Sequence, residues 1–195
     1  MSRFLIFRRL SATLMIFSAV TLLHGFAGAQ LGEKVAGFRL VDTADKTHTM
    51  SEYAGKILIL EFWSFKCPVA QVYNDRVKAL QSKYAPRGVV LLAVASNRNE
   101  SPLEVRRNAE NLSLPFPVLL DQDGVLADRV GVSQTPSVVI LDGAGILRYR
   151  GAIDNNRRVT EPGRIAYVEE AVDALLAGRP VARAETPVSG CAIRR

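Results

Sequence analysis

Cys67 and Cys191 are the residues of this 195-residue chain whose type and position could support covalent chemistry. Cys67 follows the apolar run 57–63, which indicates a buried strand, and precedes residues 68–84, whose apolar positions recur at helical spacing. A helix N-terminus and a neighbouring cation such as Lys66 stabilise a thiolate. We therefore predict a reactive thiol at Cys67, with a pKa below the usual value of about 8.5. The alternative is an inert, buried cysteine that packs like a small apolar residue.

Cys191 stands in a proline-containing segment beyond the last predicted helix, far along the chain from Cys67. Three interpretations stay open. It could be a resolving cysteine that closes a disulfide with Cys67, a fixed structural bridge to it, or an unpaired thiol that links two chains.

The elements around these cysteines alternate between strand and helix patterns, which indicates an α/β domain with helices covering a sheet. We predict a central, mostly parallel sheet with an antiparallel edge hairpin, flanked by helices. Beyond the segments around Cys67, the expected strands are 89–95, 116–120, 137–141 and 146–150, and the expected helices are 101–112, a short one ending at Val130, and 164–177.

The first 29 residues are typical of a cleaved signal peptide. A basic start precedes the apolar stretch 10–23, and Ala27-Gly28-Ala29 has the small-residue pattern of a cleavage site. A retained anchor is the alternative, but the apolar stretch is shorter than the ~20 residues that a spanning helix needs. We expect a periplasmic or secreted protein without stable membrane insertion after cleavage. Its parts are the signal peptide 1–29, a domain over 30–178 and a tail over 179–195.

Charge and histidine content narrow the possible functions. The formal net charge is +6 at pH 7, but residues 1–29 hold three arginines and no acid, so half of this excess leaves with them. No cluster of Lys and Arg interleaved with aromatic residues remains, so we expect no nucleic-acid partner. His48 is the one histidine outside the signal segment, which argues against a histidine-rich metal site and against Cys-His catalysis. We expect no metal and no cofactor, and assign His48 no role.

The segment Glu61-Phe62-Trp63-Ser64-Phe65-Lys66-Cys67-Pro68 resembles the acid-Phe-Trp-Ala-x-x-Cys segment of thioredoxins. Thr135-Pro136 before the strand 137–141 also fits, and the resemblance extends from residue 33 to about 178. It points to the redoxin branch, the AhpC/TSA (alkyl hydroperoxide reductase/thiol-specific antioxidant) superfamily within the thioredoxin fold. The resemblance implies that Cys67 is the attacking cysteine, that Pro136 is a cis-proline lying against it, and that Glu61 is a buried acid exchanging protons with the thiols.

The chain departs from both templates of this fold. Thioredoxin-type reductases have a second cysteine three positions after the first, where this sequence has Ala70. The peroxiredoxin pattern needs a hydroxyl residue three before its cysteine, which Ser64 supplies. That pattern also has a proline where Leu60 stands, and a catalytic arginine where Pro136 stands. Four other arginines could take the place of this catalytic arginine, although an arginine is more commonly a solvated surface charge: Arg106, Arg107, Arg129 and Arg148.

Three functions follow from these observations. The first is an exported thiol oxidoreductase in which Cys67 attacks a protein disulfide and Cys191 or an external thiol reductant resolves the adduct. The second is a peroxiredoxin-like peroxidase, in which a small hydroperoxide oxidises Cys67 to a sulfenic acid that condenses with Cys191. The third is a non-catalytic binding module that keeps the fold without the chemistry.

Overall fold

The computed structural model of the protein describes residues 28–156 and 162–195. The expected signal peptide falls almost entirely on residues 1–27, which lie outside the described residues. From Gly28 onward the chain is attached to the domain: the Ala29 amide donates a hydrogen bond to the Arg129 carbonyl at 2.7 Å.

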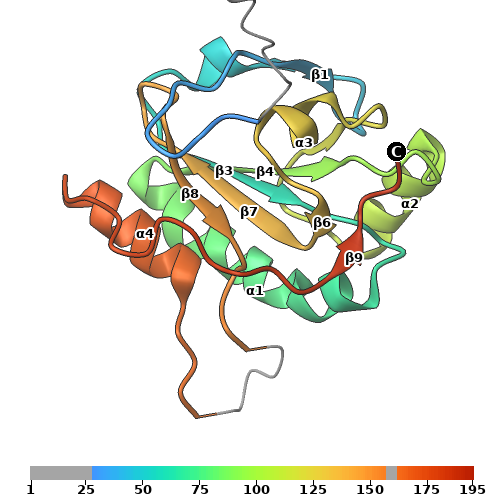
Figure 1. Cartoon of the computed structure of the whole chain (residues 1–195). Helices are drawn as coiled ribbons and strands as arrows, with labels where there is room; N and C mark the ends of the chain where they lie inside the picture. Colours follow the sequence, from blue (N-terminus) through green and yellow to red (C-terminus); the bar gives the residue numbers. More distant parts are fainter. Residues whose placement is uncertain (1–27, 157–161) are drawn as a thin grey trace, which may run out of the picture.

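A five-stranded sheet with the order β5-β4-β3-β7-β8 forms the centre of the molecule (Figure 1). Strands β3, β4 and β5 are parallel to one another, β7 is antiparallel to β3, and β8 is antiparallel to β7 at the edge. The expected α/β architecture, with a mostly parallel sheet and an edge hairpin, is therefore confirmed. The strands are β3 (Leu58–Phe62), β4 (Val90–Ala95), β5 (Val118–Leu120), β7 (Ser137–Leu141) and β8 (Leu147–Gly151).

Among the described residues, the helices α1 and α2 begin where local sequence signals favour it. Pro68 occupies the first turn of α1, where its missing amide hydrogen costs no hydrogen bond. Ser101 and Glu104 form a reciprocal capping box at the start of α2. The helices are α1 (Pro68–Tyr84), α2 (Pro102–Asn111), α3 (Val125–Arg129) and α4 (Tyr167–Leu176), with short 3-10 turns η1 (Met50–Tyr53) and η2 (Ala85–Arg87).

Both faces of the sheet are covered, so every residue of β3 is buried. Alternate residues of the strand contribute to different cores, because successive side chains point to opposite faces. Ile59 and Trp63 belong to the cluster that includes apolar residues of α1 and α4. Leu60 and Phe62 belong to the cluster that includes residues of α3.

Two small antiparallel pairs lie outside the central sheet. Strands β1 (Arg39–Val41) and β2 (Thr47–Thr49) form a hairpin. His48 of β2 is buried between Asp42, whose Oδ2 is 2.8 Å from His48 Nε2, and the hydroxyl of Tyr53. Strand β6 (Gln134–Thr135) pairs with β9 (Cys191–Ala192), which belongs to the segment after α4. Figure 1 shows this segment crossing the molecule from α4 to the end of the chain near α2.

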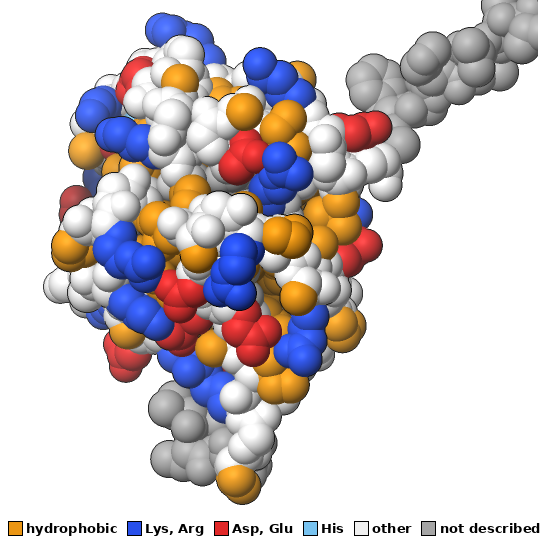
Figure 2. Space-filling model, turned by 90° about the vertical axis from the view of Figure 1, so that its left-hand side faces the viewer, with side chains coloured by type: hydrophobic (Ala, Val, Ile, Leu, Met, Phe, Trp, Pro, Cys, Tyr) orange, Lys and Arg blue, Asp and Glu red, His pale blue; other side chains and the backbone are white. Residues whose placement is uncertain are grey.

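The surface carries charges of both signs. On the face in Figure 2, basic and acidic side chains lie interspersed. Two of the ion pairs join α4 to α1 and to the following turn η2: Lys83 with Glu169 at 2.6 Å and Arg87 with Asp173 at 2.7 Å. Such exposed pairs contribute little stability. Within residues 28–156 and 162–195, no helix combines the length and the apolar character that crossing a membrane requires.

Candidate functional site

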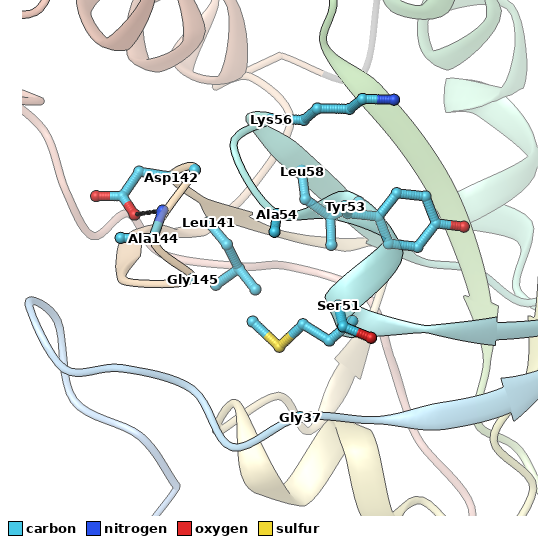
Figure 3. A pocket seen from close by; sticks show the side chains of 12 residues that line it. Gly37, Ser51, Tyr53, Ala54, Lys56, Leu58, Leu141, Asp142, Ala144 and Gly145 are labelled. Atoms are coloured by element: carbon cyan, nitrogen blue, oxygen red, sulfur yellow. Dashed lines mark hydrogen bonds between the residues drawn. The ribbon is translucent and has the colours of Figure 1, made fainter.

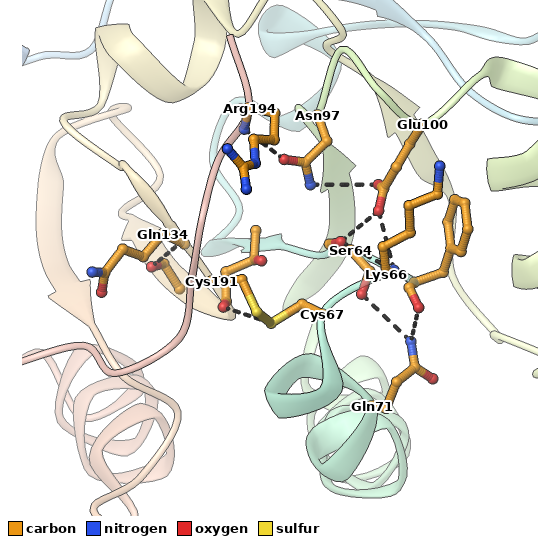
Figure 4. The surroundings of a disulfide bond; sticks show 12 residues. Ser64, Lys66, Cys67, Gln71, Asn97, Glu100, Gln134, Cys191 and Arg194 are labelled. Carbon is orange, nitrogen blue, oxygen red and sulfur yellow. Dashed lines mark hydrogen bonds between the residues drawn. A yellow bond between two sulfur atoms is a disulfide. The ribbon is translucent and has the colours of Figure 1, made fainter.

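Cys67 lies between the carboxyl end of β3 and the first turn of α1, as the residue that caps this helix. Its side chain is 1% exposed, and its sulfur forms a disulfide with Cys191, which is 124 residues away in the sequence (Figure 4). The two Cα atoms are 5.8 Å apart, within the usual range for a disulfide. This disulfide disagrees with the interpretation of Cys191 as an unpaired thiol. It agrees both with a resolving cysteine and with a fixed structural bridge.

Backbone hydrogen bonds hold the segment around Cys191 in place. The pairing of β6 with β9 sets Thr135 opposite Cys191. Beyond it, the Ile193 amide donates to the Ser133 carbonyl at 2.9 Å, and the Arg194 amide donates to Asn97 Oδ1 at 2.7 Å. Cys191 is thus fixed by non-covalent contacts in addition to the disulfide.

The peptide bond between Thr135 and Pro136 is cis, as the resemblance implied. The Cys67 sulfur lies 3.2 Å from the Thr135 carbonyl oxygen. In the disulfide this sulfur has no proton. After reduction, a thiol at this position could donate a hydrogen bond to that oxygen, so the segment before Pro136 contacts both cysteines.

Glu61 is buried near the carboxyl end of β3, where it lies opposite Ala93 of β4 and Val138 of β7. Because residues two apart share a face of a strand, Glu61 points to the same side of the sheet as Trp63, whose core cluster includes Cys67. Desolvation raises the pKa of Glu61 to about 8. A carboxyl group with this pKa can both donate and accept a proton near neutral pH.

Glu100 organises the turn that leads from β3 to Cys67, and the sequence did not identify it. Its buried carboxylate accepts a hydrogen bond from the Ser64 hydroxyl and, at 3.1 Å, one from the Lys66 amide (Figure 4). The available signal was its place in the loop after β4, since the carboxyl ends of parallel strands meet at one edge of the sheet. Ser64 is therefore held by Glu100.

The Lys66 ammonium group is engaged away from the disulfide. It donates to the Asn99 carbonyl at 2.5 Å and lies 3.6 Å from Glu104 Oε1. The N-terminus of α1 is thus the more direct source of electrostatic support for a thiolate at Cys67.

A groove of about 340 Å³ opens beside the disulfide. Its lining includes both cysteines, Ser64, Glu100 and Arg194. The arginines considered from the sequence do not line this groove. Three of them are engaged elsewhere: Arg106 with Asp45, Arg129 with the Gly37 carbonyl, and Arg148 with Asp142.

A separate pocket of about 190 Å³ lies at the opposite end of β3 (Figure 3). It is lined by Leu58, the first residue of β3, by Leu141, the last residue of β7, and by residues that include Met50 and Tyr53 of η1. Cys67 lies beyond the carboxyl end of β3, whereas the pocket lies at the first residue of this strand. The length of β3 therefore separates the pocket from the disulfide. The pocket is not part of the candidate site.

Residues 31–150 match the model of the AhpC/TSA family. The thiol-disulfide oxidoreductase ResA of Halalkalibacterium halodurans is 29% identical over 117 residues, which cover 60% of this chain and 65% of that protein. The match thus spans less than two thirds of that relative's length.

Similar solved structures include a hypothetical protein from Sinorhizobium meliloti 1021. It has a TM-score of 0.76 and 27% identity, and the match covers 86% of this chain and 95% of that one. The exposed lipoprotein thioredoxin Etrx1 of Streptococcus pneumoniae has a TM-score of 0.57 and 25% identity over 73% of this chain and 99% of that one. The expected thioredoxin-like fold is thereby confirmed.

Proposed function

The chain belongs to the AhpC/TSA family, and we propose that it is a thiol-disulfide oxidoreductase whose redox pair is Cys67 and Cys191. The observation that carries this proposal is the disulfide between these residues, formed at the start of α1 and beside cis-Pro136. The second thiol that the sequence around Cys67 lacks is supplied by β9. The printed name of the ResA relative, a thiol-disulfide oxidoreductase, agrees with this chemistry.

The reaction proceeds by two thiol-disulfide exchanges. The Cys67 thiolate attacks one sulfur of a protein disulfide, forms a mixed disulfide, and releases the other substrate sulfur as a thiolate. Cys191 then attacks the Cys67 sulfur, which closes the Cys67–Cys191 disulfide and releases the second substrate thiolate. Each substrate thiolate takes up a proton, so the substrate gains two electrons and two protons. An external thiol reductant returns the pair to the dithiol.

The remaining site residues support these steps. Glu61, buried below the site, accepts the proton of a thiol that becomes nucleophilic and returns it to the leaving group. Pro136 and the Thr135 carbonyl shape the surface against which a substrate lies. Ser64, through Glu100, positions the turn that carries Cys67.

The structure gives less support to the two other functions. A peroxidase needs a cation and a hydroxyl group directed at the reacting sulfur. Here the Ser64 hydroxyl donates its hydrogen bond to Glu100, and Pro136 occupies the place of the arginine. A non-catalytic binding module can use such a disulfide for stability, but this use gives no reason for the cysteines to lie at the start of α1, beside cis-Pro136 and a groove.

We further propose that the protein acts outside the cytoplasm. Disulfides between cysteines persist in oxidising compartments and are rare in the cytosol. The basic and apolar pattern of residues 1–29 agrees with export through a signal peptide.

Intact mass measurement of the reduced protein tests the proposed chemistry. With hydroxyethyl disulfide, we expect the wild type to lose two hydrogens, Cys191→Ser to carry one hydroxyethylthio adduct on Cys67, and Cys67→Ser to lack the rapid adduct. The same three proteins are mixed with equimolar hydrogen peroxide as a comparison. Oxidation within seconds by peroxide, together with no reaction with the disulfide, would replace the oxidoreductase by a peroxidase.

A further inference from the structure

The segment that carries Cys191 occupies a strand edge. Among the described residues, β6 forms its sheet with β9 alone, in the register Gln134 opposite Ala192 and Thr135 opposite Cys191. An extended peptide from another protein can pair with such an edge when it is free. The chain's own segment therefore stands where an extended substrate would lie, with its cysteine already bonded to Cys67.

Gly190 fits this place because it has no side chain. A Cβ added to Gly190 would stand 2.7 Å from the carbonyl carbon of Thr135 and closer still to its oxygen. The φ angle of Gly190 is not positive. Glycine is therefore required here because there is no room for a side chain, and not because of the backbone conformation. Because the obstructing atoms belong to the backbone of Thr135, a change of side-chain rotamer nearby would not relieve this clash.

Ile193 defines a second requirement, two residues after the cysteine. Its side chain is 8% exposed and belongs to the core cluster that includes Leu126 and Val132. Ala192 between them is exposed, so its side chain meets no such restriction. The edge thus accepts a glycine before the cysteine, any residue after it, and an aliphatic residue at the next position.

We propose that the β6 edge selects extended peptides by the pattern Gly-Cys-x-aliphatic, and that residues 190–193 are an internal copy of this ligand. The proposal rests on the function above and names its substrate class. In the reduced protein, a substrate segment takes the place of β9, and Cys67 attacks the disulfide of its cysteine. Residues 190–193 then displace the substrate segment from the edge, and Cys191 attacks the Cys67 sulfur and releases the substrate as a thiol.

Disulfide-linked peptides test this selectivity on the reduced full chain carrying Cys191→Ser. The probes are symmetric dimers of Val-Ser-Gly-Cys-Ala-Ile-Arg, of the same peptide with Ala in place of Gly, and of the peptide with Ser in place of Ile. The rate of adduct formation on Cys67 is followed by intact mass. We expect the first peptide to react roughly tenfold or more faster than either of the others. The alanine peptide forces a Cβ against the Thr135 backbone, and the serine peptide loses the buried aliphatic side chain, and each change costs at least about that factor.

Hydroxyethyl disulfide, which has no peptide backbone, separates the two proposals. If Cys67 reacts with it but all three peptides react at one rate, the edge does not select its ligand and this inference is wrong. If Cys67 reacts with none of the disulfides, the proposed function fails and the inference with it.

A variant of the chain's own segment gives an independent measurement. Gly190→Ala keeps both cysteines but adds the Cβ that Thr135 obstructs. We expect closure of the Cys67–Cys191 disulfide by hydroxyethyl disulfide to slow by roughly tenfold or more. Gly37→Ala is the matched control, because its added Cβ would meet no atom nearer than 4.0 Å. Closure of the Gly190 variant at the wild-type rate would contradict the inference.

Discussion

Thr135 contacts both halves of the Cys67–Cys191 disulfide: its backbone pairs with Cys191, and its carbonyl oxygen lies 3.2 Å from the Cys67 sulfur. A two-residue strand thereby fixes the distance between two cysteines from distant parts of the chain. In the proposed function, this arrangement takes the place of the second cysteine that thioredoxin-type reductases have close to the first.

The disulfide should contribute strongly to stability. We expect Cys191→Ser to lower the free energy of unfolding by about 2–5 kcal/mol relative to the oxidised wild type, because the cross-link closes a long loop. The non-covalent contacts of Ile193 and Arg194 remain in the variant, so it should still fold. Urea denaturation followed by circular dichroism measures the difference.

Reduced wild type is the control for this comparison. Its unfolding midpoint should agree with that of Cys191→Ser. A variant as stable as the oxidised protein would show that the disulfide does not restrain the unfolded chain.

Glu61 should make the protein less stable as the pH rises. Its pKa is about 8 in the folded state, raised by burial from 4.5, so between these values the folded protein holds a proton that the unfolded chain has lost. Stability therefore falls as the pH rises from about 4.5 to 8, and Glu61→Gln removes this contribution. The shift corresponds to roughly 5 kcal/mol as an upper limit.

Urea denaturation at several pH values between 5 and 9 checks this prediction. The difference between Glu61→Gln and wild type should grow with pH and become constant above about 8. Glu110→Gln, at an exposed position of α2, is the control. A Glu61 variant whose difference does not change with pH would mean that this carboxyl group ionises normally.

Glu100→Ala should affect both stability and reactivity. The variant leaves the Ser64 hydroxyl and the Lys66 amide without their common acceptor, which costs about 1.5–3 kcal/mol. Because these groups fix the turn before Cys67, we also expect slower reaction with hydroxyethyl disulfide. Glu110→Ala is the control for both measurements.

Glu100→Gln separates the two effects. Both hydrogen bonds end on Glu100 Oε1, so an amide oxygen in the same place can still accept them, and the variant should recover much of the lost stability. If it recovers the stability but not the rate, then the charge of Glu100 acts on the reaction in addition to its role in the turn.

Much of the fold follows from local patterns. The apolar run that became β3, the helical spacing of α1 and the capping box of Ser101 each lie within one short segment, where period and capping residues determine the structure. The carry-over of Pro136 from the family also agrees with the cis peptide bond.

The pairing of β9 with β6 had no such signal. Each strand has two residues, too few to show a period of two, and the residues that pair are far apart in the sequence. Glu100 was missed for a related reason: the loop that carries it has no repeating pattern, and its partner Ser64 belongs to another loop. Tertiary contacts between irregular segments determine these parts of the site.

The distance along the chain between the two cysteines has a consequence for biosynthesis. Synthesis proceeds from the N-terminus, so Cys67 emerges before β4, β5, β7, β8 and α4 have been made, and Cys191 emerges after all of them. During this time Cys67 is a thiol without its native partner. The native bond can form only after Cys191 has been made, and by then every strand of the central sheet has already been synthesised.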